Sequence, residues 1–462
     1  MPEILPAPEA WDVTTDVAVV GGGACGIIAG LRAQEAGADV LVLERDATLS
    51  GSTAMSSGFI PAPGTRFQRA IGVTDSSALF AEDIQAKAKQ GAHPGVVETA
   101  TTQIGPALEW LADRHGLEWI VLDDFLYPGH SVHRMHAVPE KTGAALITRL
   151  LNAASSADLP IVTEARVTAL HRADDRICGV TVTRPDGAAE TIGAKAIILA
   201  CNGYGGNPDL VAQHIPGIAS APYYGHPGNT GDAVLWGSAL GAMPRDMTAY
   251  QGHGSLAHPH GILITWALMM EGGIQVNALG ERFSNEHEGY SEQAVRVLAQ
   301  PDSVAWNVYD ERIHKLGLSF PDYAQAFGAG AIRRGDVHAI ADAIGVSGST
   351  LQRTLDQVAL YATGATDPFG RDFTGQPPLG QHLYAVKITG ALFHTQGGLD
   401  VDRACQVLRR DGTPIGGLYA GGGAACGVSG SRVEGYLSGN GLLTAVGMGY
   451  VSGNAAAREA LG

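Results

Sequence analysis

Tyr290 carries a phenol within a polar stretch, ERFSNEHEGYSEQA, that runs from Glu281 to Ala294. A phenol can take a proton from carbon or return one, whereas an aromatic residue in a loop usually serves packing. An unperturbed tyrosine has a pKa of about 10, so a tyrosine base needs a nearby cation, a helix N-terminus or a second tyrosine. Packing and proton transfer therefore both stay open for Tyr290.

A glycine motif, G-x-G-x-x-G, is formed by Gly21, Gly23 and Gly26. The first glycine of such a motif makes a tight turn, the second lets the backbone approach a pyrophosphate, and the third lets helix and strand pack closely. Glu44 ends the next apolar run, where a carboxylate can bind a ribose diol and would repel a 2′-phosphate. The motif predicts a dinucleotide site, although it does not separate FAD from NAD.

Small hydroxyl residues follow Glu44 in the run SGSTAMSSG, residues 50–58. Small side chains suit a backbone that wraps around a large planar cofactor, and a plain Ser/Gly loop is the alternative. Three histidines, His130, His133 and His136, are spaced three apart. Flanking prolines and a glycine favour a loop that contacts substrate or cofactor over a metal site, so we expect no metal.

The elements that must position these residues follow from the periodicity. Strand 16–20, helix 27–37 and strand 38–44 form a β–α–β unit around the glycine motif. Helices are predicted at 76–90 and 94–115, a strand-rich segment at 159–200, and a final helix from 441. Between 251 and 381 the β–α–β pattern stops, and the composition indicates helices and irregular loops. The chain therefore resembles one domain interrupted by another.

Composition and charge exclude several functional classes. The 462 residues are 45% hydrophobic and 16% charged, which is typical of a globular protein, and the net charge of -16 argues against nucleic acid and anionic membranes. Five scattered cysteines without C-x-x-C indicate reduced thiols and a cytoplasmic location. The sequence shows neither a signal-peptide pattern nor an apolar run of about 20 residues, so we expect no membrane span.

Several motifs, in their order along the chain, resemble the FAD-dependent fumarate reductase / 3-ketosteroid Δ1-dehydrogenase superfamily. They are VVGGGACG, LERD, SGSTAMSSG, AIILACNGYGGN, HPGNTGDA, GGIQVNALGERFSNE, AVKITGALFHTQGGLDVD, GGLYAGGGAACG and GNGLLTAVGMG. The resemblance covers nearly the whole chain. It implies an α/β fold, with a Rossmann-like FAD-binding domain of the glutathione-reductase type and an α+β capping domain. The implied boundaries are 1–250 and 386–462 for the FAD domain and 251–385 for the cap.

The resemblance implies non-covalent FAD, because no histidine lies in the local motif that carries the covalent flavin link in succinate dehydrogenases. The family commonly has an acid on the flavin side in GLYAAGE, and Gly423 replaces it here. The glycine motif and the resemblance together predict these cofactor contacts: Gly21, Gly23, Ala24, Cys25, Gly26, Glu44, Arg45, Ser52, Thr53, Ser57, Gly58, Val167, Cys201, Asn202, Gly203, Asp232, Gly422, Gly423, Asn440, Leu442 and Leu443.

The resemblance also places substrate contacts at the edges of the cap and in the last glycine loops, between the cap and the flavin ring. The corresponding residues are His253 or His258, Tyr290, His394, Arg432 and Tyr436. Fumarate reductases resemble this chain at His394 and Arg432, and the corresponding residues of those enzymes bind a substrate carboxylate. They place an arginine proton donor where this chain has Tyr290. Ketosteroid Δ1-dehydrogenases place a tyrosine base there and use another tyrosine, which Tyr436 resembles, to polarise the ketone.

Two further interpretations stay open. Tyr127 is a candidate second tyrosine for Tyr290, with a core position as the alternative. Arg432 can fork onto a carboxylate, with a salt bridge to Glu434 or Asp400 as the alternative. If Arg432 binds a carboxylate, a small keto acid, such as a cyclic one, is favoured over a bulky steroid.

We therefore expect a soluble FAD-dependent dehydrogenase that removes a Cα proton and a Cβ hydride next to a ketone. Tyr290 would be the base, Tyr436 and backbone amides would stabilise the enolate, and Arg432 and His394 would orient a ketone or keto-acid substrate. The rivals are an ene-reductase of the fumarate reductase type and a flavin electron-transfer subunit without turnover of its own. The sequence does not identify the electron acceptor.

Overall fold

The computed structural model describes residues 3–462, which form two compact units. The first unit extends to Ile215 and continues with Gly225–Tyr250 and His394–Gly462. The second comprises Pro216–Tyr224 and Gln251–Phe393. The chain changes unit after Tyr250, where a boundary was expected, and after Phe393, eight residues beyond the other expected boundary. The segment Pro216–Tyr224 was not expected to belong to the second unit.

A parallel sheet forms the centre of the first unit. Its strands run in the order β20 (Pro414–Ala420), β10 (Ala189–Leu199), β2 (Val13–Val20), β3 (Val40–Leu43) and β7 (Ile161–Val162). The last four residues of β2 and of β10 are all buried, which explains why they read as continuous apolar runs rather than alternating ones. The sheet is completed by β1 (Glu3–Pro6), β8 (Arg166–Ala173), β9 (Arg176–Thr183) and β19 (Gln406–Leu408).

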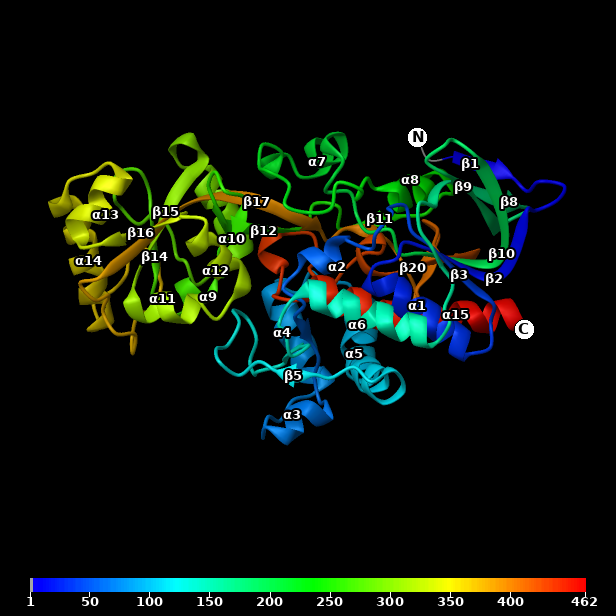
Figure 1. Cartoon of the computed structure of the whole chain (residues 1–462), viewed down its shortest axis with the longest axis horizontal. Helices are drawn as coiled ribbons and strands as arrows, with labels where there is room; N and C mark the ends of the chain where they lie inside the picture. Colours follow the sequence, from blue (N-terminus) through cyan, green and yellow to red (C-terminus); the bar gives the residue numbers. More distant parts are fainter. Residues whose placement is uncertain (1–2) are drawn as a thin grey trace. The chain divides into compact units, whose positions relative to one another are not determined.

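The two ends of the chain meet in this unit, where α1 (Ala24–Glu35) and α15 (Asn440–Leu461) pack side by side (Figure 1). Gly453 allows the close approach, because a Cβ there would lie 2.2 Å from the carbonyl oxygen of Ala29. Gly449 is equally tight, 2.6 Å from the carbonyl oxygen of Cys25. The last segment of the chain is thereby fixed against the helix that follows the glycine motif.

The remaining elements of the first unit cover the sheet and carry loops. The longest, α5 (Pro94–His115), begins after His93, whose Nδ1 accepts from Val96 N, and ends at Gly116 with a φ of 70°, as the sequence predicts. The others are α2 (Ser52–Met55), β4 (Ile60–Pro61), α3 (Arg66–Ala70), α4 (Ser77–Lys87), β5 (Ile120–Val121), β6 (Met135–Ala137), α6 (Gly143–Ser156), α7 (Pro208–His214), α8 (Asp232–Ala239), β11 (Pro244–Arg245) and β18 (Gly398–Leu399).

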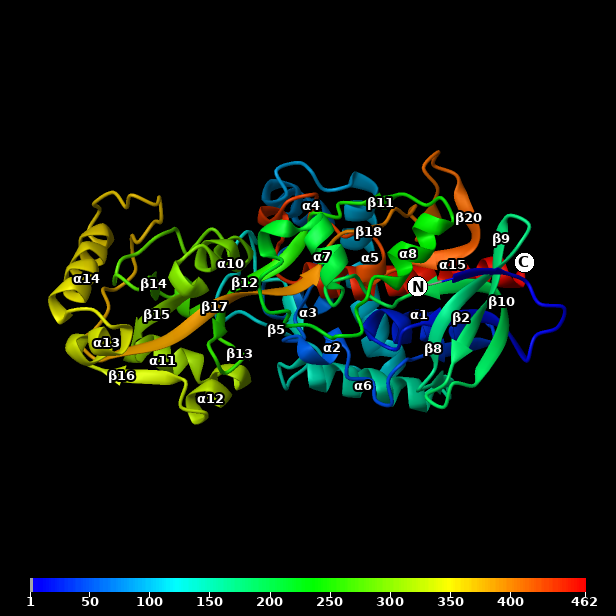
Figure 2. The ribbon, with the colours of Figure 1, turned by 90° about the horizontal axis from the view of Figure 1, so that it is seen from above.

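The second unit contains a sheet with β17 as its long central strand (Figure 2). The α+β cap implied by the resemblance includes such a sheet, whereas the composition of residues 251–381 indicated helices and irregular loops and missed the strands within that range. Strand β12 has the sequence YQGHGSLA and is buried along nearly its whole length. Because both of its faces are buried and several of its residues are glycine or polar, the sequence lacks the apolar–polar alternation by which a strand is predicted. The strands are β12 (Tyr250–Ala257), β13 (Ile262–Leu263), β14 (Ile274–Val276), β15 (Val304–Asp310), β16 (Ile332–Gly335) and β17 (Leu383–Thr395).

Six helices pack around this sheet. Apolar residues from both form two buried clusters, one around Trp266 and Tyr309 and the other around Val308 and Leu351. The helices are α9 (Ala267–Met270), α10 (Tyr290–Leu298), α11 (Glu311–Gly317), α12 (Pro321–Gly328), α13 (Val337–Ile344) and α14 (Gly348–Ala362). Helix α10 therefore begins at Tyr290, within the polar stretch from Glu281 to Ala294.

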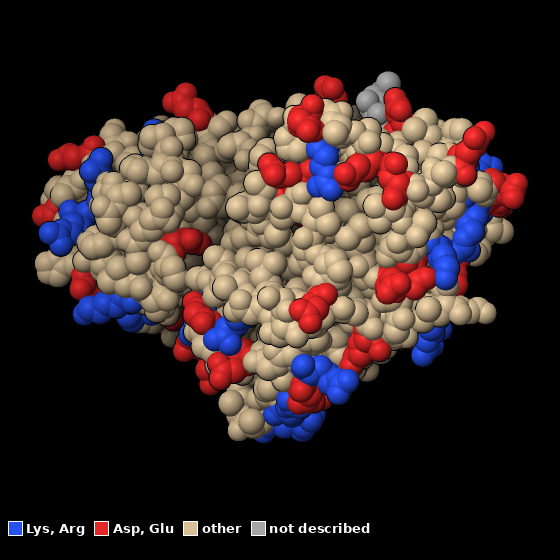
Figure 3. Space-filling view, turned by 45° about the vertical axis from the view of Figure 1, so that its right-hand side comes forward, with Lys and Arg blue, Asp and Glu red and all other residues tan. Residues whose placement is uncertain are grey.

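Charged side chains are spread over the surface drawn in Figure 3, where acidic and basic groups are interspersed. Across the described residues, 3–462, we find no helix with the length and apolar character needed to cross a membrane. Within the same range, no three His, Cys, Asp or Glu side chains are grouped in a way that could hold a metal ion.

Candidate functional site

An open cavity lies in the first unit at the carboxyl ends of β2, β3 and β10. Ligands of open α/β sheets bind at this edge. Many predicted cofactor residues line it: Gly21, Gly23, Ala24, Cys25, Glu44, Arg45, Ser52, Thr53, Val167, Cys201, Asn202, Asp232, Gly422 and Gly423. Tertiary structure thus gathers residues from both ends of the sequence around one cavity.

The glycine motif has the conformation that the sequence predicts. Gly21 has a φ of 110°, and a Cβ at Gly26 would lie 1.8 Å from the carbonyl oxygen of Gly21, so helix α1 meets the turn closely. Gly26 acts through this packing and does not line the cavity. Ala24 N, at the start of α1, donates to Thr53 Oγ1 at 3.0 Å, which ties the motif to the hydroxyl-rich run.

Glu44 is held at the side of the cavity by backbone donors. Its Oε2 accepts from Gly22 N at 2.9 Å, and its Oε1 accepts from Asp46 N at 3.0 Å. Asp46 contacts His226 Nε2 at 3.0 Å and Arg45 Nε at 3.5 Å. A carboxylate held at the position of Glu44 suits a ribose diol and opposes a 2′-phosphate, so this end of the cavity fits the adenosine half of FAD.

The other predicted cofactor residues lie outside the lining of this cavity. In the hydroxyl-rich run only the first part reaches the cavity. Gly58 instead approaches α6, where a Cβ would lie 2.8 Å from the carbonyl of Thr142. Gly203 packs against Thr395, and a Cβ there would lie 2.1 Å from its Oγ1. Cofactor contact stays a prediction for Ser57, Gly58, Gly203, Asn440, Leu442 and Leu443.

Several lining residues were missed by the sequence analysis. His226, Gly228 and Asn229 belong to HPGNTGDA, a motif that supported the resemblance and could have indicated them. Gly22 and Asp46 gave a weaker signal, because each is adjacent to a predicted contact. The other residues missed are Val20, Leu43, Gly51, Ala165, Arg166, Ala200, Trp236, Gly421 and Ala445.

His394 and Tyr436 lie together in the first unit, edge to face, with ring centroids 5.6 Å apart. Burial lowers the pKa of His394 to about 4, so its imidazole is neutral at pH 7. Gln396 Nε2 contacts His394 Nδ1 at 3.0 Å, and Ser429 Oγ donates to Gln396 Oε1 at 2.7 Å. Asn440, at the start of α15, contacts Ser429 Oγ at 3.0 Å. This chain of polar contacts fixes the His394 ring.

Arg432 is exposed just before the short turn Val433–Gly435. Asp400, one of its two alternative partners, instead binds Arg245 at 2.7 Å. Throughout residues 3–462, no carboxylate forms an ion pair with Arg432, Glu434 included. The structure therefore gives Asp400 another partner, and carboxylate binding by Arg432 stays a prediction.

In the second unit, Tyr290 lies in a cluster of rings. His253 stacks on Tyr290 with centroids 4.9 Å apart, and its other face stacks on Phe393 at 5.1 Å. Trp266 meets His253 edge-on at 5.7 Å and Tyr290 at 6.2 Å. Of the two alternatives for a substrate histidine, His253 belongs to this cluster, whereas His258 is exposed.

Two nitrogen atoms in this cluster stand out. Burial lowers the pKa of His253 to about 3, so the ring stays neutral. Its Nδ1 and the Nε1 of Trp266 are buried, and neither has a hydrogen-bond partner within the described residues. An unpaired buried polar atom costs about 1–3 kcal/mol, so each of these two nitrogens is a candidate contact for a polar ligand.

The position of Tyr290 follows from helix α10. Ser291 Oγ accepts from Gly252 N at 3.0 Å and donates to Gly252 O at 3.1 Å, which joins the first turn of α10 to β12 next to His253. Gly254 lets the helix approach, because a Cβ there would lie 2.7 Å from the carbonyl carbon of Gln293. Tyr290 is the first residue of the helix and lies at its positive end, where negative charge is stabilised.

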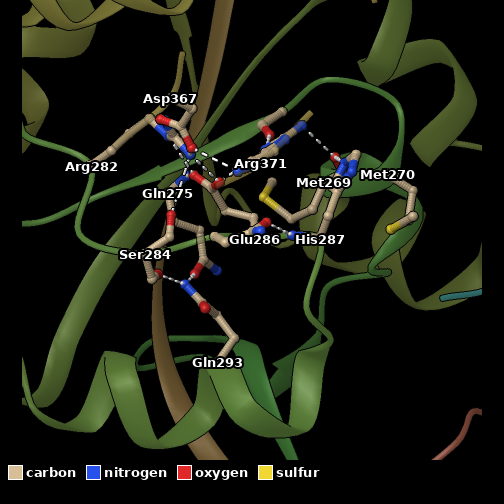
Figure 4. A network of polar contacts seen from close by, with 12 residues as sticks. Met269, Met270, Gln275, Arg282, Ser284, Glu286, His287, Gln293, Asp367 and Arg371 are labelled. Carbon is tan, nitrogen blue, oxygen red and sulfur yellow. Dashed lines mark hydrogen bonds and ion pairs between the residues drawn. The ribbon is translucent and has the colours of Figure 1, made fainter. Parts of the chain in front are cut away.

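A buried ionic network anchors the segment before Tyr290. Figure 4 shows Arg282, Glu286, Arg371 and Asp367 pointing toward one another. Glu286 is fully buried and lies 2.7 Å from Arg282 Nη2 and 3.1 Å from Arg371 Nη1. Burial alone would raise the pKa of Glu286, but Arg371 and Arg282 lower it to about 2.

The two glutamates that precede Tyr290 in the sequence both pair with arginines of the second unit. Glu286 takes buried partners, and the exposed Glu288 pairs with Arg296. Gln293 of α10 also donates to Gln275 Oε1 at 2.7 Å, and Gln275 N donates to Glu286, so α10 is tied to the network.

The remaining candidates lie in the first unit. Tyr127 packs against Phe59 and Phe125 in a small apolar cluster, as its core alternative describes, and its role as partner to Tyr290 stays a prediction. His130 Nε2 contacts Ser438 O at 3.0 Å, and burial lowers its pKa to about 3. His136 lies in strand β6 rather than in a loop, because this short strand pairs with both β4 and β5.

Comparison with known proteins agrees with this geometry. A family model described as "FAD binding domain" matches residues 16–442. The probable fumarate reductase Ifc3 of Shewanella frigidimarina (strain NCIMB 400) is 30% identical over 455 residues, covering 97% of this chain and 76% of that protein. The 4-oxocyclohexanecarboxylate 2-dehydrogenase of Sinomonas cyclohexanicum is 26% identical over 556 residues, covering 97% of this chain and 94% of the relative.

Among solved structures, the open conformation of a flavocytochrome c3 fumarate reductase superposes with a TM-score of 0.82 at 29% identity. The match covers 98% of this chain and 80% of that one. The similarity therefore extends over both compact units rather than over the cofactor domain alone.

Proposed function

The chain belongs to the FAD binding domain family, and from this premise we propose that it is an FAD-dependent dehydrogenase that introduces a C=C bond next to a ketone. The chain is a flavoprotein oxidoreductase that acts on CH–CH groups. The predicted α/β fold with an FAD-binding domain is confirmed by the family match and by the structural similarity. The direction of the reaction, the substrate and the catalytic residues are the proposal.

The position of Tyr290 is the observation that carries the direction. A phenol at the start of α10, fixed to β12 and stacked on a neutral histidine, is suited to take a proton from carbon. The positive end of the helix stabilises the phenolate, which meets one of the requirements stated for a tyrosine base. An arginine proton donor, which would favour reduction of a dicarboxylate, is absent from position 290 itself.

The proposed roles divide between the two units. Tyr290 of the second unit takes the proton from the carbon next to the ketone. Tyr436 of the first unit donates to the ketone oxygen and stabilises the enolate, while His394, held neutral by burial, orients the substrate. Arg432 supplies the positive charge that binds a substrate carboxylate. FAD, which Glu44, Ser52 and Thr53 would help to hold without a covalent link, would supply the hydride acceptor.

A relative's activity supports a carboxylate-bearing ketone as the substrate class. The Sinomonas relative is named for dehydrogenation of a cyclic keto acid, and the same combination of ketone and carboxylate fits Tyr436 and Arg432. The second candidate function is reduction of an activated C=C bond. It is favoured by the 30% identical relative, a probable fumarate reductase, and by His394 and Arg432.

Anaerobic flavin spectroscopy tests the proposal. Oxidised enzyme is mixed with cyclohexanone, with 4-oxocyclohexanecarboxylate and, as a control, with cyclohexanecarboxylate, and the flavin absorbance is followed. The dehydrogenase predicts bleaching by the ketones, fastest with the keto acid, and none with the control. Reduced enzyme that is reoxidised by fumarate or urocanate, without bleaching by any ketone, would replace the proposal with the reductase. Absence of both reactions would indicate a flavin carrier.

A further inference from the structure

Asn202 adopts a backbone conformation that most residues avoid. It follows strand β10 at the edge of the cofactor cavity and has a φ of 65°, in the left-handed region. Asparagine tolerates this region better than most residues, because its short amide can bond locally. Asn202 Oδ1 accepts from Gly203 N at 2.8 Å, and Nδ2 donates to Ser52 Oγ at 2.9 Å. The strained residue therefore fixes a particular side-chain position.

The Asn202 amide fills the space that a side chain at position 423 would need. A Cβ on Gly423 would lie 2.1 Å from Asn202 Oδ1 and 3.0 Å from Gly203 N. The amide cannot simply move with its backbone, because Gly203 is already packed against Thr395. A side chain at position 423 and the observed position of the Asn202 amide therefore exclude each other.

The same amide determines what Ser52 can offer to the cavity. Ser52 Oγ accepts from Asn202 Nδ2 and from Asn229 Nδ2, each at 2.9 Å. A hydroxyl has two acceptor positions and one hydrogen to donate. With both acceptor positions used by amides, the hydroxyl hydrogen of Ser52 is directed away from them. Ser52, Asn202 and Asn229 all line the cavity, and FAD carries many acceptor oxygens on its pyrophosphate and ring.

We propose that Asn202 is a positioning residue for FAD. Its amide occupies the space that a side chain at position 423 would take and, together with Asn229, holds Ser52 as a hydrogen-bond donor to the cofactor. The conformational cost at Asn202 is retained because its amide holds Ser52 in position in the lining of the cavity. The proposal depends on FAD as the cofactor and on neither the substrate nor the direction of the reaction.

The test measures FAD binding to apoprotein, by quenching of flavin fluorescence, for wild type, N202G, G423A and the double variant. N202G removes the donor to Ser52 and is expected to weaken FAD binding about tenfold. Its apoprotein should melt no lower than wild type, because glycine prefers a positive φ. G423A displaces the amide and should weaken binding at least as much. In the N202G background, G423A should change the dissociation constant by less than about twofold.

Gly416→Ala is the matched control, since a Cβ there makes ordinary contacts at 3.5 Å or more and should leave FAD binding unchanged. Equal effects of G423A with and without Asn202, or normal FAD binding by N202G, would overturn the proposal. If G423A is not recovered folded, recovery of the folded double variant supports the proposal, and failure of both contradicts it. If the variants bind FAD as expected here but no ketone bleaches the flavin, the result contradicts the proposed dehydrogenase reaction and leaves the role of Asn202 supported.

Discussion

The imidazole of His253 lies on the phenol ring of Tyr290, with centroids 4.9 Å apart and 25° between the ring planes. The contact joins strand β12 to the first residue of helix α10 within one unit. It depends on Gly252 and Gly254, which flank His253 and let the helix approach the strand. The stacking fixes the ring of the proposed base while leaving the imidazole neutral.

Tyr290→Phe should lower kcat by about 10²–10⁴-fold, because it removes the group that transfers the proton and keeps the ring that stacks on His253. The measurement is anaerobic single-turnover flavin reduction by a saturated ketone, with circular dichroism to confirm folding. Tyr361→Phe is the matched control, since Tyr361 of the same unit packs against Phe373. Full turnover by the Tyr290 variant would assign this tyrosine to packing.

Arg432→Ala should raise KM for a keto acid by about 10–100-fold while changing KM for the uncharged ketone little, because a charge-assisted hydrogen bond is worth about 1.5–3 kcal/mol. Steady-state kinetics with cyclohexanone and 4-oxocyclohexanecarboxylate measure the difference. Arg403→Ala serves as the control, as this exposed arginine pairs with Glu98. Equal losses for the two ketones would argue against carboxylate binding by Arg432.

The neutral, buried state of His253 predicts a dependence of stability on pH. Burial lowers its pKa from 6.5 to about 3, so between these values the unfolded state binds a proton that the folded state does not. Acidification below pH 6.5 should therefore destabilise the protein through His253 by about 1.4 kcal/mol per pH unit, until the folded pKa is reached.

Urea unfolding between pH 7 and pH 5 measures this dependence. His253→Phe, which can still stack, should lose stability less steeply on acidification than wild type. The exposed His260→Phe is the control and should keep the wild-type slope. Identical slopes for wild type and His253→Phe would show that His253 does not remain neutral in the folded protein.

Glu286→Gln should destabilise the second unit by about 3–5 kcal/mol, because it leaves the buried guanidinium groups of Arg282 and Arg371 without their shared carboxylate. Glu288→Gln should cost less than about 1 kcal/mol, because Glu288 and Arg296 form an exposed pair. Thermal and urea unfolding measure both. A Glu286 variant as stable as the Glu288 variant would show that the network contributes little.

The carboxylate of Glu286 also sets an acid limit. Its pKa is lowered from 4.5 to about 2, so its stabilising contribution is complete above pH 4.5 and is lost as the pH falls toward 2. Because Gln275 joins Glu286 to α10 through Gln293, we expect acid loss of the network to disturb the ring position of Tyr290 as well. Near-ultraviolet circular dichroism of the tyrosine and tryptophan bands follows this change.

The sequence alone determined the cofactor end of the molecule. The glycine motif, Glu44 and the strand–helix–strand pattern around them are local features, whose spacing depends only on the geometry of one turn and two adjacent strands. The same is true of the caps of α5. Local signals failed for the second unit, where the glycine-containing strand β12 is buried on both sides and shows no alternation.

Only the tertiary structure decided the surroundings of each functional group. It stacked His253 on Tyr290, paired Asp400 with Arg245 rather than Arg432, and placed the Asn202 amide where a side chain at position 423 would lie. These partners are separated by 37, 155 and 221 positions along the chain, respectively. Residue type and short-range spacing carry no information about such distant contacts, because they arise when the sheets and helices pack.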